Sequence, residues 1–331
     1  MNKILKYLFE HKTLSAENAK QVLMNISRGI YSESEIASFA TVFLMRSITI
    51  AEVEGFSAAL MELCVPVNLK GREVIDLVGT GGDGKNTFNI STLSTFIVAG
   101  AGISVAKHGN YGATSISGSS NVMENLGYRF SADNDKLLKE LDETNVCFMH
   151  APLFHPALKQ VASVRKSLGV RTFFNMLGPL VNPARPQVQL LGVFNLEMAR
   201  IYTYLFQQSG KKFMIVHSLD GYDEISLTND TKIITNAGEK IVSAQVLGKH
   251  TVSPEEIYGG NTPVEAAKIF ISILQGNGSV SQDAVVIANS AMAIHAMNNL
   301  TDYETCYEMA SESLKSGKAY KNFLTLMSLQ S

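Results

Sequence analysis

The stretch from Gly79 to Thr92 constrains the fold more than any other part of this sequence. It reads Gly-Thr-Gly-Gly-Asp-Gly-Lys-Asn-Thr-Phe-Asn-Ile-Ser-Thr, and four of its first six residues are glycine. A short apolar run over 74–78, typical of a buried strand, precedes it, and the run 90–99 has the length of a helix. Glycine allows sharp turns and close approach of the backbone. We therefore predict a strand, a tight loop and a helix.

This glycine loop predicts an anion site, because backbone N–H groups at a helix N-terminus can surround a phosphate. A plain tight turn is the alternative. Gly79, Gly81 and Gly84 match the dinucleotide fingerprint, which is normally followed about 20 residues later by an acid. No Asp or Glu occurs between Lys85 and Met123. Asn86 also stands where a nucleotide-binding P-loop needs Ser or Thr. Both familiar nucleotide motifs are disfavoured.

A second possible anion site follows in the acid-free window. A pocket for a highly charged phosphate compound should lack carboxylates except where a metal intervenes. Lys107 directly follows the second predicted strand, 103–106, and supplies a positive charge. The hydroxyl-rich segment 115–121 then leads into an apolar helical pattern, so it resembles another helix N-terminus. Two such sites suit a donor with phosphates at both ends, and a serine-rich cap without ligand is the alternative.

The chain as a whole predicts an α/β protein with a small N-terminal helical domain and a larger domain built on a mostly parallel sheet. Residues 1–70 read as successive helices, with capping-box spacing at Ser32 and Glu35 and at Thr49 and Glu52. We expect part of the segment 155–186 to belong to this N-terminal helical domain as well. Residues 71–331 contain strand patterns at 188–193 and 213–216 and helical patterns at 196–208, 262–274 and 283–296.

The composition of the chain limits the classes of partner that it can be expected to bind. With 331 residues and a net charge of -2, the chain has no overall positive field for nucleic acid or an anionic membrane. Its most apolar stretch, 96–106, is too short and too glycine-broken to cross a bilayer. The three cysteines have no metal-ligand or disulfide spacing, which favours the cytoplasm. A small ligand is the expected partner.

These segments together resemble the anthranilate phosphoribosyltransferases. The resemblance lies in Gly79–Asp83, Asn89–Thr92 and Lys107–Asn110, and it continues through 155–183 and the acidic segment 220–226, in order and over nearly the whole chain. It implies a nucleoside phosphorylase/phosphoribosyltransferase-like fold. It also implies transfer of the phosphoribosyl group of 5-phosphoribosyl 1-diphosphate to the amine of anthranilate in tryptophan biosynthesis, Mg²⁺ as cofactor, and a homodimer formed through the N-terminal helices.

The resemblance also implies site residues. The phosphoribosyl diphosphate site would comprise Gly79, Gly82, Asp83, Thr87, Asn89, Ile90, Ser91, Thr92, Lys107, His108, Gly109, Asn110, Tyr111, Gly112, Ala113, Thr114, Ser115 and Ser119. Magnesium would be held by Ser91, Asp223 and Glu224, and anthranilate by Gly79, Asn110 and Arg165. His108, His155 and Pro179 would line the channel of the aromatic acid. The sequence departs from the family pattern at Tyr111, Gly112, Ile116 and Asn121.

The reaction suits these residues. Displacing diphosphate builds oxocarbenium character on the sugar and negative charge on the leaving group, so metal and phosphate-binding donors matter more than a nucleophile. Hard carboxylates such as Asp223 and Glu224 suit Mg²⁺, although a solvated acidic turn is the simpler interpretation of that pair alone. The amine of anthranilate is neutral at pH 7 and needs no dedicated base. His108 and His155 are candidate catalytic residues that could equally be structural. Arg165, in a helix opened by His155-Pro156, suits a carboxylate, or is a surface charge.

Two other functions remain to be distinguished. A pyrimidine nucleoside phosphorylase has a similar Lys-His-Gly-Asn block but carries a further C-terminal domain, for which this chain ends too soon. A relative that binds nucleic acid would need a basic face, which the net charge of -2 does not favour.

Overall fold

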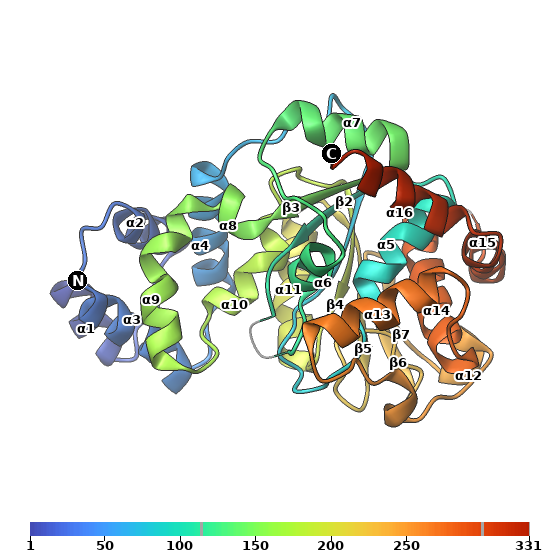
Figure 1. The fold of residues 1–331 in the computed structure, drawn as a ribbon. Coiled ribbons are helices and arrows are strands. Elements are labelled where there is room, and N and C mark those ends of the chain that lie inside the picture. The colour runs from blue at the N-terminus through green and yellow to red at the C-terminus, as the bar shows by residue number, and fades with distance from the viewer. Residues whose placement is uncertain (113–114, 299–300, 331) are drawn as a thin grey trace. The chain divides into compact units, whose positions relative to one another are not determined.

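The computed structural model describes residues 1–112, 115–298 and 301–330. The chain folds as two compact units. One comprises Met1–Val67 and Ala151–Arg185, and the other comprises Asn68–His150 and Pro186–Ser331. Figure 1 shows the first as an assembly of helices and the second as a sheet with helices packed on it. Each unit is described by itself below.

The helical unit begins with four helices, as predicted. Their bounds are α1(Asn2–Phe9), α2(Ala16–Ser27), α3(Glu33–Met45) and α4(Ile50–Leu63). Both predicted capping boxes are confirmed: Ser32 and Glu35 begin α3, and Thr49 and Glu52 begin α4. The later segment contributes α8(Ala151–Phe154), η1(Pro156–Leu158), α9(Lys159–Leu168), α10(Phe174–Leu177) and η2(Gly178–Leu180). The predicted helix opened by His155-Pro156 is therefore a 3-10 turn that continues into α9.

An aromatic cluster forms the centre of the helical unit. Phe39 of α3 and Phe56 of α4 meet edge to face with ring centroids 6.0 Å apart, and Phe173 stacks on Phe56 at 4.5 Å. All three rings are buried. Such pairs add to the apolar area that they bury. The late segment is thus tied to α3 and α4 through Phe173.

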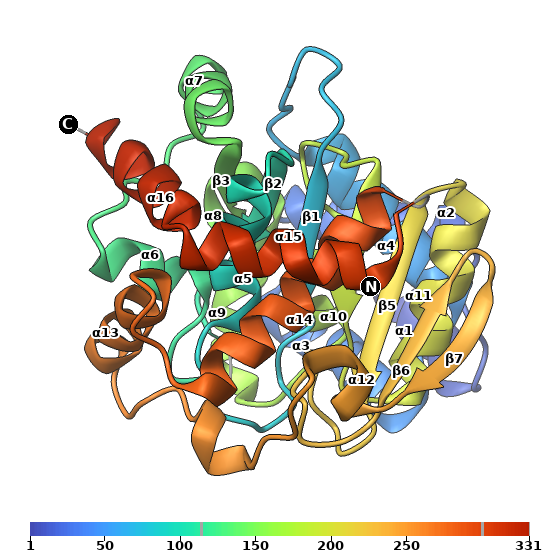
Figure 2. The ribbon, with the colours of Figure 1, turned by 90° about the vertical axis from the view of Figure 1, so that its right-hand side faces the viewer.

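The second unit is built on a seven-stranded sheet in the order β3-β2-β1-β4-β5-β6-β7. The strands are β1(Ile75–Gly79), β2(Val105–Gly109), β3(Val146–His150), β4(Val188–Gly192), β5(Lys212–Ser218), β6(Thr231–Thr235) and β7(Gly238–Val242). β1 to β5 pair in parallel, which agrees with the prediction. The antiparallel hairpin β6–β7 was not predicted, and Figure 2 shows it at the edge of the sheet.

Helices cover both faces of this sheet. Those of the unit are α5(Ile90–Gly100), α6(Ser119–Asn125), α7(Asn134–Thr144), α11(Leu196–Ser209), α12(Ala244–Gly248), α13(Pro263–Leu274), α14(Val280–Met297), α15(Tyr303–Lys315) and α16(Lys318–Ser328), with the 3-10 turn η3(Pro254–Ile257). Met214 and Val216 of β5 belong to the core that contains α5 and α14. Phe213 instead meets Phe206 of α11, with ring centroids 5.4 Å apart. Because successive strand residues face opposite sides, α11 covers the other face.

The strand order reverses direction between β1 and β4. The chain passes from β1 outward to β2 and β3, and later from β4 the other way to β5. In open α/β sheets, ligands bind at such a switch point, beyond the carboxyl ends of the strands. The glycine loop leaves β1 at this place. The topology therefore puts the loop where a ligand is expected.

No helix among the described residues combines the length and the apolar character needed to cross a membrane.

Candidate active site

The glycine loop begins where β1 ends and turns through three left-handed glycines. Gly81, Gly82 and Gly84 have φ angles of 66°, 77° and 73°, a region that other residues adopt at a cost. Thr80 donates its N–H to the carbonyl of Gly192, at the end of β4, over 3.0 Å. The loop thus spans the switch point between the two strands.

The second half of the loop is fixed by a segment that the sequence did not reveal. Asn86 donates its side-chain amide to the carbonyl of Gly260 over 2.7 Å. The N–H of Gly259 donates to the carbonyl of Asn86 over 2.8 Å, and Thr87 forms an isolated bridge with Tyr258. A side chain at Gly259 would overlap Thr87. A loop distant in the sequence therefore fixes Asn86, the residue that stands where a P-loop would have Ser or Thr.

The acidic pair predicted to bind metal lies against the glycine loop. A carboxylate oxygen of Asp223 accepts the N–H of Gly81 over 2.5 Å. A Cβ at Gly79 would lie 2.6 Å from the same oxygen, so only glycine allows this approach. Glu224 accepts hydrogen bonds from the hydroxyl and the backbone N–H of Ser91, at the start of α5. The structure thus brings Ser91, Asp223 and Glu224 together, although 132 residues separate Ser91 from Asp223 in the sequence.

Buried hydrogen bonds fix the acidic segment from behind. Asn289 of α14, itself 1% exposed, accepts the N–H of Ile225 over 3.1 Å and donates to its carbonyl over 2.8 Å. Ser218, at the end of β5, donates its hydroxyl to the carbonyl of Glu224 over 2.7 Å. A side chain at Gly192 would overlap the backbone of Asp223. The pair is therefore set on a rigid support.

Lys107 lies beneath the loop and not in its opening. Its side chain is buried, and the ammonium donates to the carbonyl of Leu77 over 2.5 Å and to the hydroxyl of Ser91 over 3.3 Å. Burial lowers the pKa of Lys107, while the charges of Asp76 and Glu224 oppose that change. Lys107 thus acts on the site through Ser91 and Glu224.

The pKa values of three carboxyl groups at the glycine loop, those of Asp83, Asp223 and Glu224, are raised. Burial raises the pKa of Asp223 well above its ordinary value, and the charges of Glu224 and Asp83 raise it further. Burial likewise raises the pKa of Glu224 to about 7, against the opposing effects of Lys107 and Ser91. Burial also raises the pKa of Asp83, whose carboxyl group is hydrogen-bonded to that of Asp223. A hydrogen bond between two carboxyl groups needs a proton, and a bound cation can take the place of that proton.

The second predicted anion segment adjoins the glycine loop. Asn89 donates its side-chain amide to the carbonyl of Ser117 over 2.9 Å. The side-chain oxygen of Asn121 accepts the N–H groups of Gly112 and Gly118, each over 2.9 Å, which closes this loop on itself. A side chain at Gly118 would overlap the backbone of Gly112. Asn121 departs from the family pattern, and its structural role here is plain.

Several predicted residues of that segment have defined places. Asn110 accepts the N–H of Ser120 at its carbonyl over 3.1 Å, and Ser119 approaches the same carbonyl with its hydroxyl. The ring of Tyr111 meets His150 edge to face at 4.7 Å, and its hydroxyl donates to Glu124 over 2.7 Å. Tyr111 therefore packs locally. Ala113 and Thr114 lie outside the described residues.

Three buried polar atoms at these loops lack hydrogen-bond partners among the described residues. They are Oγ1 of Thr80, the side-chain oxygen of Asn89 and Oγ of Ser117. Buried polar groups are nearly always hydrogen-bonded in folded proteins. Their gathering at the two loops is an independent indication that a polar ligand completes the site.

The two candidate catalytic histidines lie in different units. His108 lies on β2, and its backbone N–H approaches a carboxylate oxygen of Asp76 at 3.4 Å. His155 precedes η1, where its side chain does not cap the turn. One of its ring nitrogens lies 2.8 Å from the carbonyl of Val181, and burial lowers the pKa of His155. These contacts give His155 a structural role in the helical unit.

Arg165 and Pro179 also belong to the helical unit. Arg165 lies in α9, and burial lowers the pKa of its guanidinium. Its side chain makes no ion pair or hydrogen bond with any residue that the structure describes. Pro179 is buried within η2. A guanidinium without a protein partner is free to bind an anion.

Fold and site together define a class of enzyme, one that transfers a glycosyl group from a phosphorylated donor. The chain matches the glycosyl transferase family at its helical bundle domain over residues 2–64 and at its a/b domain over residues 71–320.

Similar proteins make the assignment specific. An anthranilate phosphoribosyltransferase of Christiangramia forsetii is 55% identical over 329 residues, covering 99% of both chains, and that of Flavobacterium psychrophilum is 56% identical over the same length and coverage. The crystal structure of the Thermus thermophilus enzyme has a TM-score of 0.91 at 30% identity and covers 98% of each chain. A Saccharomyces cerevisiae enzyme in complex with PRPP and Mg shares the fold, with a TM-score of 0.87 at 24% identity over 96% of this chain and 93% of that one.

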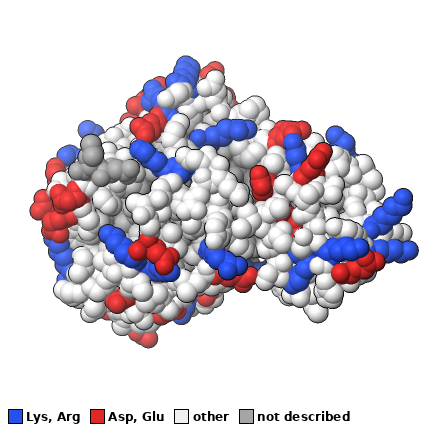
Figure 3. Space-filling model, turned by 180° about the vertical axis from the view of Figure 1, so that it is seen from behind, with Lys and Arg blue, Asp and Glu red and all other residues white. Residues whose placement is uncertain are grey.

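The chain therefore belongs to the anthranilate phosphoribosyltransferases, and the resemblance inferred from its motifs is confirmed. It is a pentosyltransferase that transfers the phosphoribosyl group of 5-phosphoribosyl 1-diphosphate to anthranilate, in tryptophan biosynthesis. The nucleoside phosphorylase and nucleic-acid-binding alternatives are set aside. On the face shown in Figure 3, basic and acidic side chains are interspersed.

Proposed function

We propose that the switch-point site holds the diphosphate of the donor together with magnesium. One observation carries this proposal: Asp223 and Glu224 lie against the glycine loop and Ser91, where backbone N–H groups and carboxylates converge. Phosphate oxygens suit the N–H groups, and a cation suits the acids. No group of three or more His, Cys, Asp or Glu side chains among the described residues could hold a metal by itself. Magnesium is the fitting ion, because it takes much of its shell from phosphates and water.

We assign donor binding to both loops. The residues are Gly79, Gly82, Asp83, Thr87, Asn89 to Thr92, and Lys107 to Ser115 with Ser119, among which Ala113 and Thr114 lie outside the described residues. The unpartnered atoms of Thr80, Asn89 and Ser117 support this assignment. Lys107 contributes indirectly, because its ammonium is hydrogen-bonded beneath the loop. Tyr111 contributes least, since its side chain is engaged with His150 and Glu124 and its N–H is donated to the side-chain oxygen of Asn110.

Magnesium is the proposed cofactor, held by Ser91, Asp223 and Glu224. The yeast relative in complex with PRPP and Mg supports this choice. When bound, the ion neutralises charge that develops on the departing diphosphate. The chain's own task is to orient the donor, because the hydrogen bonds of Thr80 to Gly192 and of Gly81 to Asp223 hold the glycine loop in one conformation. A loop that is fixed before the substrate binds need not reorganise during the reaction.

Anthranilate is proposed to bind through Gly79, Asn110 and Arg165. The guanidinium of Arg165 has no partner among the described residues, and its planar fork matches a carboxylate. No general base is assigned, because the substrate amine is neutral before attack and loses its proton afterwards. His108 and Pro179 are proposed as lining residues. The hydrogen bond of His155 to Val181 favours a structural role for that residue.

We further propose a cytoplasmic homodimer. Phe9 of α1 and Met45 of α3 are 62% and 84% exposed, and apolar helix surfaces of this kind are typical of interfaces between subunits. All three cysteines are free, which suits a reducing compartment. Light scattering of the full chain should give twice the chain mass, and Phe9→Glu combined with Met45→Glu should give the mass of one chain.

The metal assignment is tested with Asp223→Asn combined with Glu224→Gln. We expect this variant to lose the magnesium dependence of anthranilate consumption, followed by anthranilate fluorescence in the presence of the donor. Asp220→Asn is the matched control, because Asp220 lies in the same segment but accepts its hydrogen bond from Thr228. An unchanged magnesium titration in the double variant would refute the assignment, provided that circular dichroism shows it folded.

A further inference from the structure

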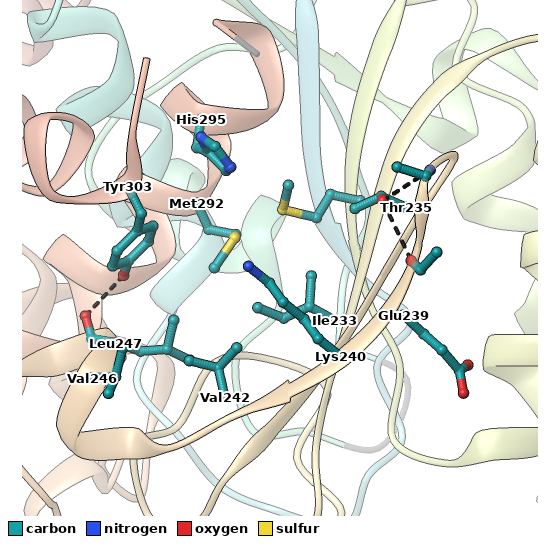
Figure 4. Close-up of a pocket in the computed structure, with 13 residues that line it drawn as sticks. Ile233, Thr235, Glu239, Lys240, Val242, Val246, Leu247, Met292, His295 and Tyr303 are labelled. Carbon is teal, nitrogen blue, oxygen red and sulfur yellow. Dashed lines mark hydrogen bonds between the residues drawn. The ribbon is translucent and has the colours of Figure 1, made fainter. Parts of the chain in front are cut away.

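A cavity of about 410 Å³ lies beside the β6–β7 hairpin (Figure 4). In the strand order, β4 and β5 stand between this hairpin and β1, the strand that the glycine loop follows. Residues of β5, β6, β7, α12, α14 and α15 line it. Thr235, at the turn of the hairpin, pairs with Met214 near the start of β5, and Thr231 pairs with Ser218 at its end. The turn therefore lies toward the amino ends of the parallel strands. The glycine loop lies at their carboxyl ends, so the cavity is separate from the proposed donor site.

Most of the cavity wall is apolar. Ile233, Val242, Leu247 and Met292 contribute aliphatic and thioether surface. Cavities of this size and character commonly hold small molecules, with a few polar groups fixing their orientation. An apolar body of moderate size would therefore bury part of its surface here.

Lys240 supplies a positive charge to this apolar cavity. Figure 4 shows its ammonium turned toward Met292 and His295. Its side chain makes no ion pair or hydrogen bond within the part of the chain that the structure describes. The neighbouring Glu239 also lines the cavity, but its carboxylate pairs with Lys232 at 3.0 Å. An anionic group on a ligand would thus meet an ammonium that is not paired with this carboxylate.

His295 supplies a hydrogen-bond acceptor. Its Nδ1 lies 2.9 Å from the carbonyl of Thr301, and a carbonyl can only accept, so Nδ1 carries the hydrogen of the neutral ring. The other ring nitrogen, Nε2, then accepts hydrogen bonds. The remaining polar side chain of note, Tyr303, already donates its hydroxyl to the carbonyl of Leu247 over 2.8 Å. The ligand should therefore combine an apolar body, an anion and an N–H donor.

We propose that this cavity is a second binding site, separate from the active site, for an amino acid with an apolar side chain. Its carboxylate pairs with Lys240, its ammonium donates to His295, and its side chain packs on Ile233 and Met292. Because α14 carries both Met292 and the Asn289 that holds Ile225, the ligand would rest on the same helix that supports the acidic segment.

Three indole compounds test this chemistry: L-tryptophan, indole-3-propionate without the ammonium, and tryptamine without the carboxylate. The chain contains no tryptophan, so indole fluorescence anisotropy reports the bound probe alone. The full-length protein should bind L-tryptophan, bind indole-3-propionate more weakly, and bind tryptamine weakest of all. Lys240→Gln should weaken L-tryptophan binding by roughly two- to fivefold, because Lys240 is exposed and exposed ion pairs are weak. Val246→Phe should also weaken it, because Val246 lines the cavity yet is 62% exposed, and the larger ring can fill the cavity without disturbing the core.

Lys212→Gln is the matched control, a lysine of β5 outside the cavity lining, and it should bind as the original protein does. Calorimetric titration in the presence of saturating anthranilate, and separately of phosphoribosyl diphosphate, should still show L-tryptophan binding. Equal affinity for tryptamine, equal losses in the Lys212 and Lys240 variants, or displacement by either substrate would each overturn the proposal. So would the absence of binding at millimolar probe.

Discussion

Replacing Asn289 by alanine should damage both stability and metal dependence. Asn289 is buried in α14 and satisfies both backbone groups of Ile225, the residue that directly follows Glu224. Alanine would leave that N–H and that carbonyl buried without partners. Each of the two unsatisfied groups costs about 1–3 kcal/mol, so we expect a loss of roughly 2–6 kcal/mol in the free energy of unfolding. For a chain of 331 residues, that corresponds to a fall in Tm of roughly 3–9 °C.

Ser290→Ala is the matched control for this change. Ser290 is the next residue of α14, is equally buried, and donates its hydroxyl to the carbonyl of Val286 over 2.6 Å. That carbonyl belongs to the helix itself, so removing the hydroxyl leaves no isolated loop group. We expect a loss of about 1 kcal/mol or less. Differential scanning calorimetry of the two variants separates the cost of orphaning Ile225 from the general cost of changing α14.

The functional consequence follows from the position of Ile225. When its backbone is released, Glu224 and Asp223 lose their fixed orientation toward Ser91 and Gly81. The magnesium concentration for half-maximal activity should rise several-fold in Asn289→Ala, while the KM for anthranilate changes little. Unchanged magnesium half-saturation, or a Tm no lower than that of Ser290→Ala, would refute this reasoning.

Three further perturbations probe other charges. Arg165→Ala should raise the KM for anthranilate with little change in that for the phosphoribosyl donor, and equal effects on both in initial-rate kinetics would exclude the carboxylate role. The pKa of Glu224 is raised to about 7, so its neutral form is favoured in the fold and stability without magnesium falls as pH rises toward that value. Magnesium must displace that proton, so its affinity should rise by up to about tenfold per pH unit below 7 and then level off, and a flat profile in pH-dependent metal titrations would contradict this. Glu52→Ala should cost about 3–5 kcal/mol in urea unfolding, because it leaves Arg46 without its buried partner, and a loss below about 1 kcal/mol would show the pair to be dispensable.

Local signals in the sequence predicted local structure well. Ser32 with Glu35 needs only four residues to form a capping box, and the box is present. The glycine loop likewise indicated the strand and helix on either side of it. The hairpin β6–β7 was missed because its strands are partly polar, unlike the apolar runs that mark the strands of a parallel sheet. The turn at Asn236 to Gly238 was the available signal.

Contacts between distant segments could not be predicted in this way. Asn289 and Ile225 are 64 residues apart, and Asn86 and Gly260 are 174 apart. Neither pair has a motif, because a single buried amide can satisfy any backbone group that the fold brings near it. The burial of Lys107 beneath the loop was equally invisible, since the sequence places it at the end of a strand without showing which face of the sheet it joins.

The charges at the glycine loop couple the binding of donor and metal under the proposed assignment. Asp83, Asp223 and Glu224 gather three carboxyl groups at the loop, while the buried Lys107 supplies one positive charge beneath them. A diphosphate brings further negative charge to the same place, so donor and protein repel each other unless a divalent cation lies between them. Repulsion between carboxylates also contributes to the raised pKa values of Asp223 and Glu224 in the free protein, where bound protons take the place of the cation. Donor and magnesium must then strengthen each other's binding by the same factor, because the coupling between two ligands is reciprocal.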